Sequence, residues 1–132
     1  MKLRKRQTSR SGAAVIEFAI CLPVMLVMVL GAIECCSMIF VDQSLNVVAY
    51  ETVRAAIRGN AGPGVAQARA QQVIAERRLK QTVVTLNPPN PESADRGTPI
   101  TVTVTTPTDA NSVMGMDFFS GSLQAVAVMN KE

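Results

Sequence analysis

The chain contains no histidine and no tryptophan, and charged residues make up only 17% of its 132 residues. Without histidine, no imidazole is available as a general base near neutral pH or as a metal ligand. Its glycines form no phosphate-cradling loop, and its Asp and Glu residues show no metal-ligand spacing. The sequence therefore predicts a protein that is not an enzyme and that requires no cofactor or metal.

Cysteine is also scarce, and all three cysteines lie in one apolar stretch near the N-terminus: Cys21, Cys35 and Cys36. Small secreted domains that lack a large core commonly depend on disulfides. Because no cysteine follows Val41, we expect the later part of the chain to be held together by packing alone. Cysteines in an apolar helix usually act as small apolar side chains; pairing of Cys35 or Cys36 between subunits is the alternative.

The formal net charge of +3 comes from the N-terminal leader, residues 1–12. This leader holds five of the thirteen Lys and Arg residues and none of the ten Asp and Glu residues. Without it the chain has eight basic and ten acidic side chains, a balance of −2. The basicity therefore does not indicate a nucleic-acid partner. It follows the pattern in which positive charge stays on the cytoplasmic side of a membrane.

The longest feature of the sequence is an apolar stretch from Gly12 to Val41. As a helix, the part from Ala13 to Ile33 would rise about 31 Å, which matches a hydrocarbon core of roughly 30 Å. A cleaved secretory signal would have a shorter apolar region, of about 7–15 residues, and a small-x-small cleavage site. We therefore predict a transmembrane helix over residues 13–41, with the N-terminus cytoplasmic and the C-terminal domain extracytoplasmic.

Glu17 is the only charged residue between Ala13 and Ile33, and a carboxylate within hydrocarbon costs about 2.5–3.5 kcal/mol on insertion scales. One interpretation is a glutamate near a helix end that snorkels to the headgroups or is protonated. The other follows from spacing. If a protease cut after Gly12, Ala13 would carry a new α-ammonium group four residues before Glu17, on the same helix face.

These residues resemble a known processing motif. The run GAAVIEF, residues 12–18, is similar to the prepilin cleavage motif of the type IV pilin superfamily, in which cleavage follows the glycine and a glutamate is fifth in the mature chain. More narrowly, residues 9–34 resemble the start of TadE-like proteins, the minor pseudopilins of tight-adherence (Tad, or Flp) pilus systems. The pair Glu17-Phe18 and Pro23 support this subgroup.

The resemblance implies that prepilin peptidase cuts between Gly12 and Ala13, and that Glu17 and Phe18 act in amine pairing and assembly. It also implies a single-pass protein of the bacterial inner membrane. Its partners would be lipid, other pilins or pseudopilins, and the inner-membrane assembly platform. Pro23 removes one helical hydrogen bond; it either kinks the helix where subunits pack or is a bend that a membrane helix tolerates.

The remaining residues predict an α+β fold. Apolar residues at spacings of three and four predict that the membrane helix continues over residues 42–58, an arrangement that the pilin resemblance also implies. Glycine and proline then end it before a small domain over 65–132, which begins with a second helix over 65–80. A small three-stranded antiparallel sheet completes the domain. Its strands are expected at 81–86, 100–105 and 123–130, with Ala125, Ala127 and Met129 on one face of the last.

The loop from Pro107 to Gly121 contains an apolar pair, Phe118 and Phe119. Exposed apolar patches mark interfaces, so this pair is a candidate contact with another subunit. Alternatively, it covers the open end of the core.

These features predict a minor pseudopilin that serves as a structural or assembly subunit of a Tad pilus or a related envelope apparatus. The alternative is a permanently membrane-anchored extracytoplasmic module, a binding or adhesin-like domain that never enters a filament.

Overall fold

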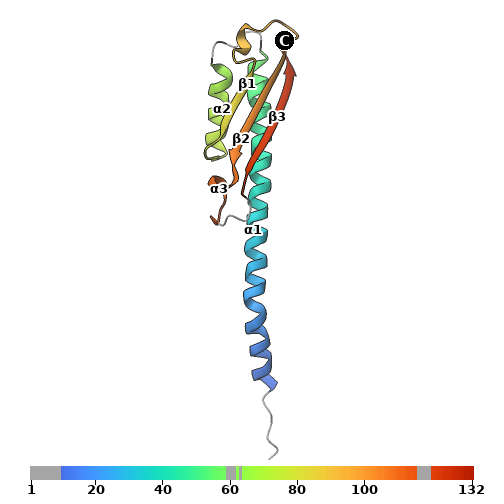
Figure 1. The fold of residues 1–132 in the computed structure, drawn as a ribbon, viewed down its shortest axis with the longest axis vertical. Helices are drawn as coiled ribbons and strands as arrows, with labels where there is room; N and C mark the ends of the chain where they lie inside the picture. Colours follow the sequence, from blue (N-terminus) through green and yellow to red (C-terminus); the bar gives the residue numbers. More distant parts are fainter. Residues whose placement is uncertain (1–9, 59–61, 63, 116–119) are drawn as a thin grey trace, which may run out of the picture. The chain divides into compact units, whose positions relative to one another are not determined.

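The computed structural model describes residues 10–58, 62, 64–115 and 120–132, and it divides the chain into two compact units. We call these the N-terminal unit, residues 1–33, and the C-terminal unit, residues 34–132. The predicted α+β fold is confirmed, with three helices, one 3-10 helix and three strands within the described ranges (Figure 1). In chain order they are α1 (Arg10–Ala56), α2 (Val65–Glu76), β1 (Val83–Asn87), η1 (Pro91–Ser93), β2 (Pro99–Pro107), α3 (Thr108–Asn111) and β3 (Ser122–Asn130).

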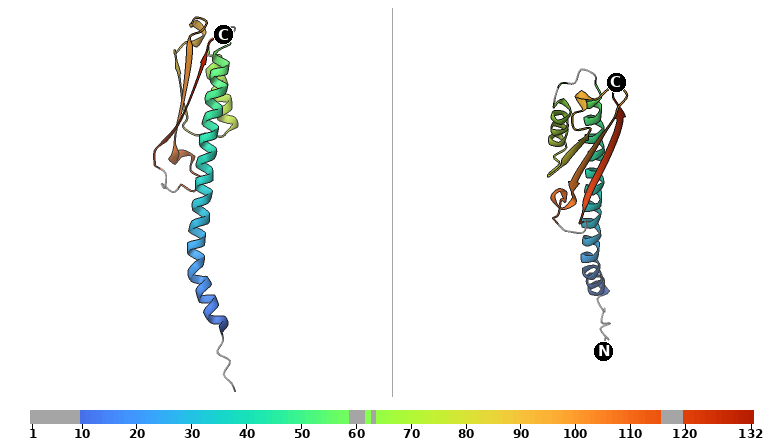
Figure 2. Two further views of the ribbon diagram at one scale, coloured as in Figure 1. Left: turned by 90° about the vertical axis from the view of Figure 1, so that its right-hand side faces the viewer. Right: turned by 45° about the horizontal axis from the view of Figure 1, so that its top comes forward.

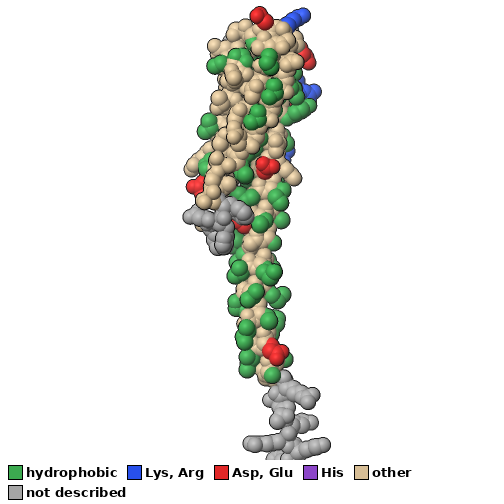
Figure 3. All heavy atoms as spheres, turned by 45° about the vertical axis from the view of Figure 1, so that its right-hand side comes forward, with side chains coloured by type: hydrophobic (Ala, Val, Ile, Leu, Met, Phe, Trp, Pro, Cys, Tyr) green, Lys and Arg blue, Asp and Glu red, His purple; other side chains and the backbone are tan. Residues whose placement is uncertain are grey.

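Helix α1 contains the whole apolar stretch and continues beyond it. It runs without a break from Arg10 to Ala56, with Pro23 inside it, which confirms that one long helix includes both predicted segments. It ends slightly before the predicted Arg58. By length and composition it is the one helix in the described part of the chain that could cross a membrane, and none of its most apolar window is buried. In the space-filling view, hydrophobic side chains are spread along the visible face of this apolar part, with an acidic side chain near its lower end (Figure 3).

The hydrophobic core lies in the C-terminal unit. There α1 buries residues at spacings of three and four, the helical period, and these pack with α2 and the sheet. The two further views show the sheet against this part of α1, with α2 beside the same part of the helix (Figure 2). The core of the unit is built from Leu45, Val48 and Val53 of α1, Ala70 and Val73 of α2, and Ile100, Val102 and Val104 of β2.

The three strands form one antiparallel sheet in the order β1-β2-β3. The strand β2 is central and alternates as predicted, with Ile100, Val102 and Val104 buried. Val104 pairs with Val84 on one side and with Ala125 on the other, so one face of all three strands meets the core. The predicted faces of β3 are confirmed, because Ala125 is buried whereas Val126 and Val128 are exposed.

Several boundaries differ from the sequence prediction. Helix α2 ends at Glu76 and not at Lys80, because Arg78 adopts φ 55, a left-handed conformation that ends a helix. The strand β1 begins at Val83, two residues later than predicted, after Gln81 with φ 52. The short helix α3 was not predicted; it lies inside the loop that follows β2.

Two polar side chains fasten the ends of these elements. Asn111 accepts a hydrogen bond from the backbone N–H of Lys80 at 2.9 Å, and its amide nitrogen donates to the carbonyl of Lys80 at 3.0 Å. Lys131 donates from Nζ to the carbonyl oxygens of Pro91 and Glu92. Buried polar groups are normally satisfied in this way. The link after α2 is thus tied to α3, and the residue after β3 is tied to η1.

Candidate functional site

The predicted processing and assembly residues lie together at the start of α1, in the N-terminal unit. Gly12, Ala13, Glu17 and Phe18 are all exposed. Because α1 begins at Arg10, the bond between Gly12 and Ala13 lies in the first turn of the helix. Helix ends fray readily, so this bond is at the part of the helix that a protease can open at least cost.

Glycine at position 12 is not required by the packing of the chain. A Cβ atom added to Gly12 would meet no heavy atom within 4 Å, and the backbone there is helical. A side chain at this position would therefore leave the described structure undisturbed. If glycine is needed at position 12, the need arises from a partner that must approach the backbone.

Glu17 follows Ala13 by four residues of continuous helix. Residues at this spacing are neighbours on one face, with their Cβ atoms about 5–6 Å apart. Within the described ranges Glu17 is an exposed carboxylate for which the structure shows neither a hydrogen bond nor an ion pair. The geometry thus places Glu17 where it could pair with a charge at position 13 or with a group of another molecule.

Phe18 and Pro23 extend the exposed apolar surface beyond Glu17. The side chain of Phe18 is 62% exposed, and Pro23 lies within α1, which continues as helix on both sides of it. Both are accessible to a neighbouring helix or to lipid. The roles assigned to them from the sequence remain predictions.

The predicted contact residues Phe118 and Phe119 lie outside the described residues. The part of their loop that the structure does describe meets α1: the backbone N–H of Met114 donates to Glu34 Oε2 at 3.3 Å. Sequence reasoning assigned no role to Glu34. The signal that could have found it is its position, as the first charged residue after the membrane-length segment.

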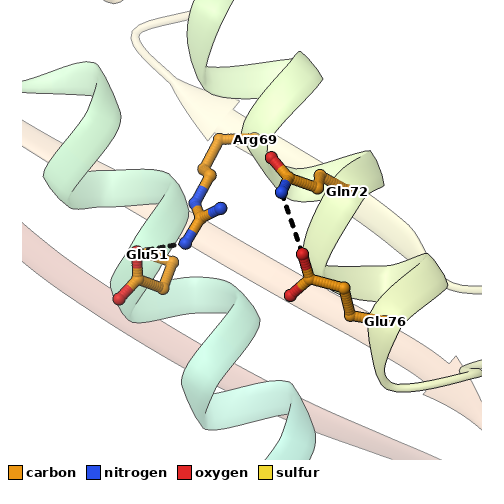
Figure 4. Close-up of polar contacts among 4 residues, drawn as sticks. All are labelled: Glu51, Arg69, Gln72 and Glu76. Atoms are coloured by element: carbon orange, nitrogen blue, oxygen red, sulfur yellow. Dashed lines mark hydrogen bonds and ion pairs between the residues drawn. The ribbon is translucent and has the colours of Figure 1, made fainter.

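Described residues of the C-terminal unit line surface grooves, of which two stand out. The first, of about 230 Å³, is lined by Glu51 and Arg54 of α1, by Arg58 just after that helix, and by Arg69 of α2. Arg69 donates to Glu51 Oε2 at 3.0 Å, and Gln72 bonds Glu76 one turn apart on α2 (Figure 4). A surface ion pair of this kind contributes about 0–1 kcal/mol, so it is a modest link between the helices. The second groove, of about 510 Å³, lies between α1 and β3 and includes Tyr50 and Val126.

Neither groove contains a recognisable catalytic set. Within the described ranges, no group of three His, Cys, Asp or Glu side chains could hold a metal ion. The ionisable side chains of the first groove are three arginines and one glutamate, which provide neither a general base paired with a nucleophile nor two facing carboxylates. The start of α1 is therefore the better candidate site.

The fold and the site define a class: an α+β protein whose long, apolar N-terminal helix is consistent with a single-pass membrane anchor. The start of this helix carries, exposed, the residues that resemble a prepilin cleavage motif. Residues 12–54 match the sequence model of the family described as TadE-like protein. The chain is thus similar to TadE-like proteins over the segment from Gly12 to Arg54, as the resemblance predicted. No curated protein and no solved structure matches the chain.

Proposed function

We propose that this chain is a minor pseudopilin, a structural or assembly subunit of a Tad pilus or a related envelope apparatus, and not an enzyme. It is made with a basic leader, cut after Gly12 by prepilin peptidase, and held in the bacterial inner membrane by α1. The observation that supports this most directly is the family match, which begins at Gly12 and includes Glu17 and Pro23. The exposed, helical setting of these residues agrees with it.

Cleavage would create the charge that Glu17 needs. The new α-ammonium group of Ala13 would stand at the N-terminus of a helix, where the helix dipole disfavours a positive charge. Glu17 lies one turn further along on the same face, so its carboxylate can neutralise that ammonium group in the same chain or in a neighbouring subunit. In this proposal each group compensates for the unfavourable position of the other.

Removal of the leader would also change the balance of side-chain charge from +3 to −2. Before cleavage, the five basic residues of the leader hold the N-terminus at the cytoplasmic face. After cleavage, the subunit is free of that electrostatic anchor and can be drawn out of the membrane. The partners in this step are the inner-membrane assembly platform and other pilins or pseudopilins.

The N-terminus of the protein in its own membrane tests the proposal. The chain is extracted from strains with and without active prepilin peptidase, and its intact mass is measured. We expect the chain to begin at Ala13 in the first strain and to retain the leader in the second. A retained leader in the presence of active peptidase would falsify the proposal.

A permanently anchored binding or adhesin-like module is the second candidate. The observation that favours it is that the family match ends at Arg54, so α2 and the sheet lie outside the part of the chain that resembles TadE-like proteins. In that case the chain would keep its leader and would be absent from sheared filaments.

A further inference from the structure

Glu34 occupies an unusual position in the chain. It directly follows the stretch from Ala13 to Ile33, whose helical length of about 31 Å matches the hydrocarbon core, and it is the first residue of the C-terminal unit. Its side chain is only 1% exposed. A buried carboxylate needs a hydrogen-bond donor, and the structure supplies the backbone N–H of Met114, eighty residues further along the chain.

This bond holds a tight turn against α1. The turn comprises residues 112–115, in which the backbone N–H of Gly115 donates to Ser112 Oγ at 2.9 Å. Gly115 has φ 63, a conformation that glycine adopts at little cost. Two successive backbone N–H groups, those of Met114 and Gly115, are therefore satisfied by side chains within the unit.

The tip of the turn is apolar. Val113 is 67% exposed. The surface of α1 beside Glu34 is apolar too, since Ile33, Ile39 and Phe40 are exposed and no charged residue occurs between Glu34 and Asp42. An apolar tip whose neighbouring N–H groups are already bonded is suited to contact with lipid, where unsatisfied backbone groups are costly.

We propose that the turn 112–115 rests on the outer interface of the membrane that α1 crosses, with Val113 in contact with lipid. Glu34 acts as a positioning residue: its carboxylate holds Met114, and with it the turn, at the first residue that follows the apolar segment in the chain. This inference rests on the membrane placement in the proposed function. It adds a second lipid contact, which would set the C-terminal unit in a defined orientation on the membrane surface.

The absence of tryptophan from the chain allows a direct test. Single-tryptophan variants of the full chain are reconstituted in vesicles of brominated phosphatidylcholine, which quench a tryptophan that touches lipid. The reporter is Val113→Trp. The matched control is Val128→Trp, because Val128 is also an exposed valine, 56% exposed, but lies on β3 beside the opposite end of β2. We expect Val113→Trp to be quenched at least about twofold more than Val128→Trp, as for a side chain at the headgroup boundary.

A third variant separates this inference from the proposed function. Val24→Trp places the reporter inside the apolar segment and should be strongly quenched. Quenching of Val24→Trp without quenching of Val113→Trp would overturn the inference alone, whereas no quenching of either would also remove the membrane anchor. If the tryptophan of Val113→Trp is not quenched by lipid but becomes protected from solvent in assembled pili, the turn contacts a neighbouring subunit. That result would overturn the lipid contact.

The role of Glu34 is tested in the Val113→Trp background. Glu34→Ala removes the acceptor and should reduce the quenching, whereas Glu34→Gln retains an acceptor oxygen and should preserve most of it. Resistance of the C-terminal unit to proteolysis checks the fold of each variant.

If Glu34→Ala fails to fold, Ser112→Ala loosens the turn by removing the acceptor for Gly115. If Val113→Trp fails, Met114→Trp replaces it. Unchanged quenching after the turn has been loosened would overturn the positioning role.

Discussion

Lys131 donates a hydrogen bond from its side-chain ammonium to the carbonyl oxygen of Pro91 at 2.5 Å, and Lys131 is only 8% exposed. The same ammonium donates to the carbonyl of Glu92 at 2.7 Å. The backbone of Lys131 is bonded as well, to Gly97 and Thr98. Lys131, which follows β3, thus bonds the segment between β1 and β2 at four residues.

Replacement of this lysine should therefore destabilise the C-terminal unit. Lys131→Met keeps much of the side-chain volume but leaves two carbonyl groups without their charged donor, and we expect a loss of about 1.5–3 kcal/mol in the free energy of unfolding. The measurement is urea unfolding of the full chain in detergent, followed by the fluorescence of Tyr50, the single tyrosine. The control is Lys80→Met, because the side chain of Lys80 is exposed. Equal stability of the two variants would contradict the bonding role of Lys131.

At Thr52, in contrast to Lys131, removal of a polar group should not lower the free energy of unfolding. It is fully buried in α1, and its hydroxyl oxygen is the one buried side-chain polar atom without a hydrogen-bond partner in the described part of the chain. Thr52→Val replaces this hydroxyl with a methyl group of similar shape, so it should leave the stability unchanged or raise it by about 1 kcal/mol. Thr52→Ser keeps the hydroxyl and removes a buried methyl group, and should lower the stability by about 1 kcal/mol. The same urea titration measures both, and a less stable Thr52→Val would reveal a partner for the hydroxyl.

Gly12 should be required by the peptidase and not by the fold. A Cβ atom at Gly12 or at Gly31 would meet nothing within 4 Å, and both glycines lie in α1. Gly12→Val and Gly31→Val are therefore matched substitutions. We expect Gly12→Val to reduce the cleaved fraction to roughly a tenth or less, since a side chain blocks close approach to the backbone, whereas Gly31→Val is cleaved normally. Intact masses of the membrane-extracted chains provide the readout, and normal cleavage of Gly12→Val would refute the assigned site.

Glu17 should act after cleavage. In Glu17→Ala the new ammonium group of Ala13 has no carboxylate one turn away, so we expect normal cleavage but about tenfold less protein in sheared pili, because an uncompensated charge in the membrane is costly. Glu76→Gln is the control, since Glu76 is an exposed glutamate on α2. Immunoblots compare the sheared and membrane fractions. Loss of cleavage in Glu17→Ala, or unchanged assembly, would each contradict this division of roles.

The sequence was enough to predict the helices and strands in which apolar residues recur at a regular spacing. The apolar run of α1 and the alternation of Ile100, Val102 and Val104 with threonines are visible in the sequence, because each is a short-range periodicity. The motif that resembles a prepilin cleavage site is equally local: Gly12, Ala13 and Glu17 lie within a turn and a half of helix. Their roles in cleavage and assembly stay predictions for the variants above to test.

Other features do not follow from a short-range periodicity. The end of α2 is set by Arg78 in a left-handed conformation, although the sequence continues with residues that suit a helix. The bond between Glu34 and Met114 joins residues eighty positions apart, and the bond between Lys131 and Pro91 joins residues forty apart. The sequence by itself determined the helix, the strands and the motif, since these follow from neighbours in the chain. Only the tertiary structure decided which charged residues are buried, because burial depends on which loop folds over them.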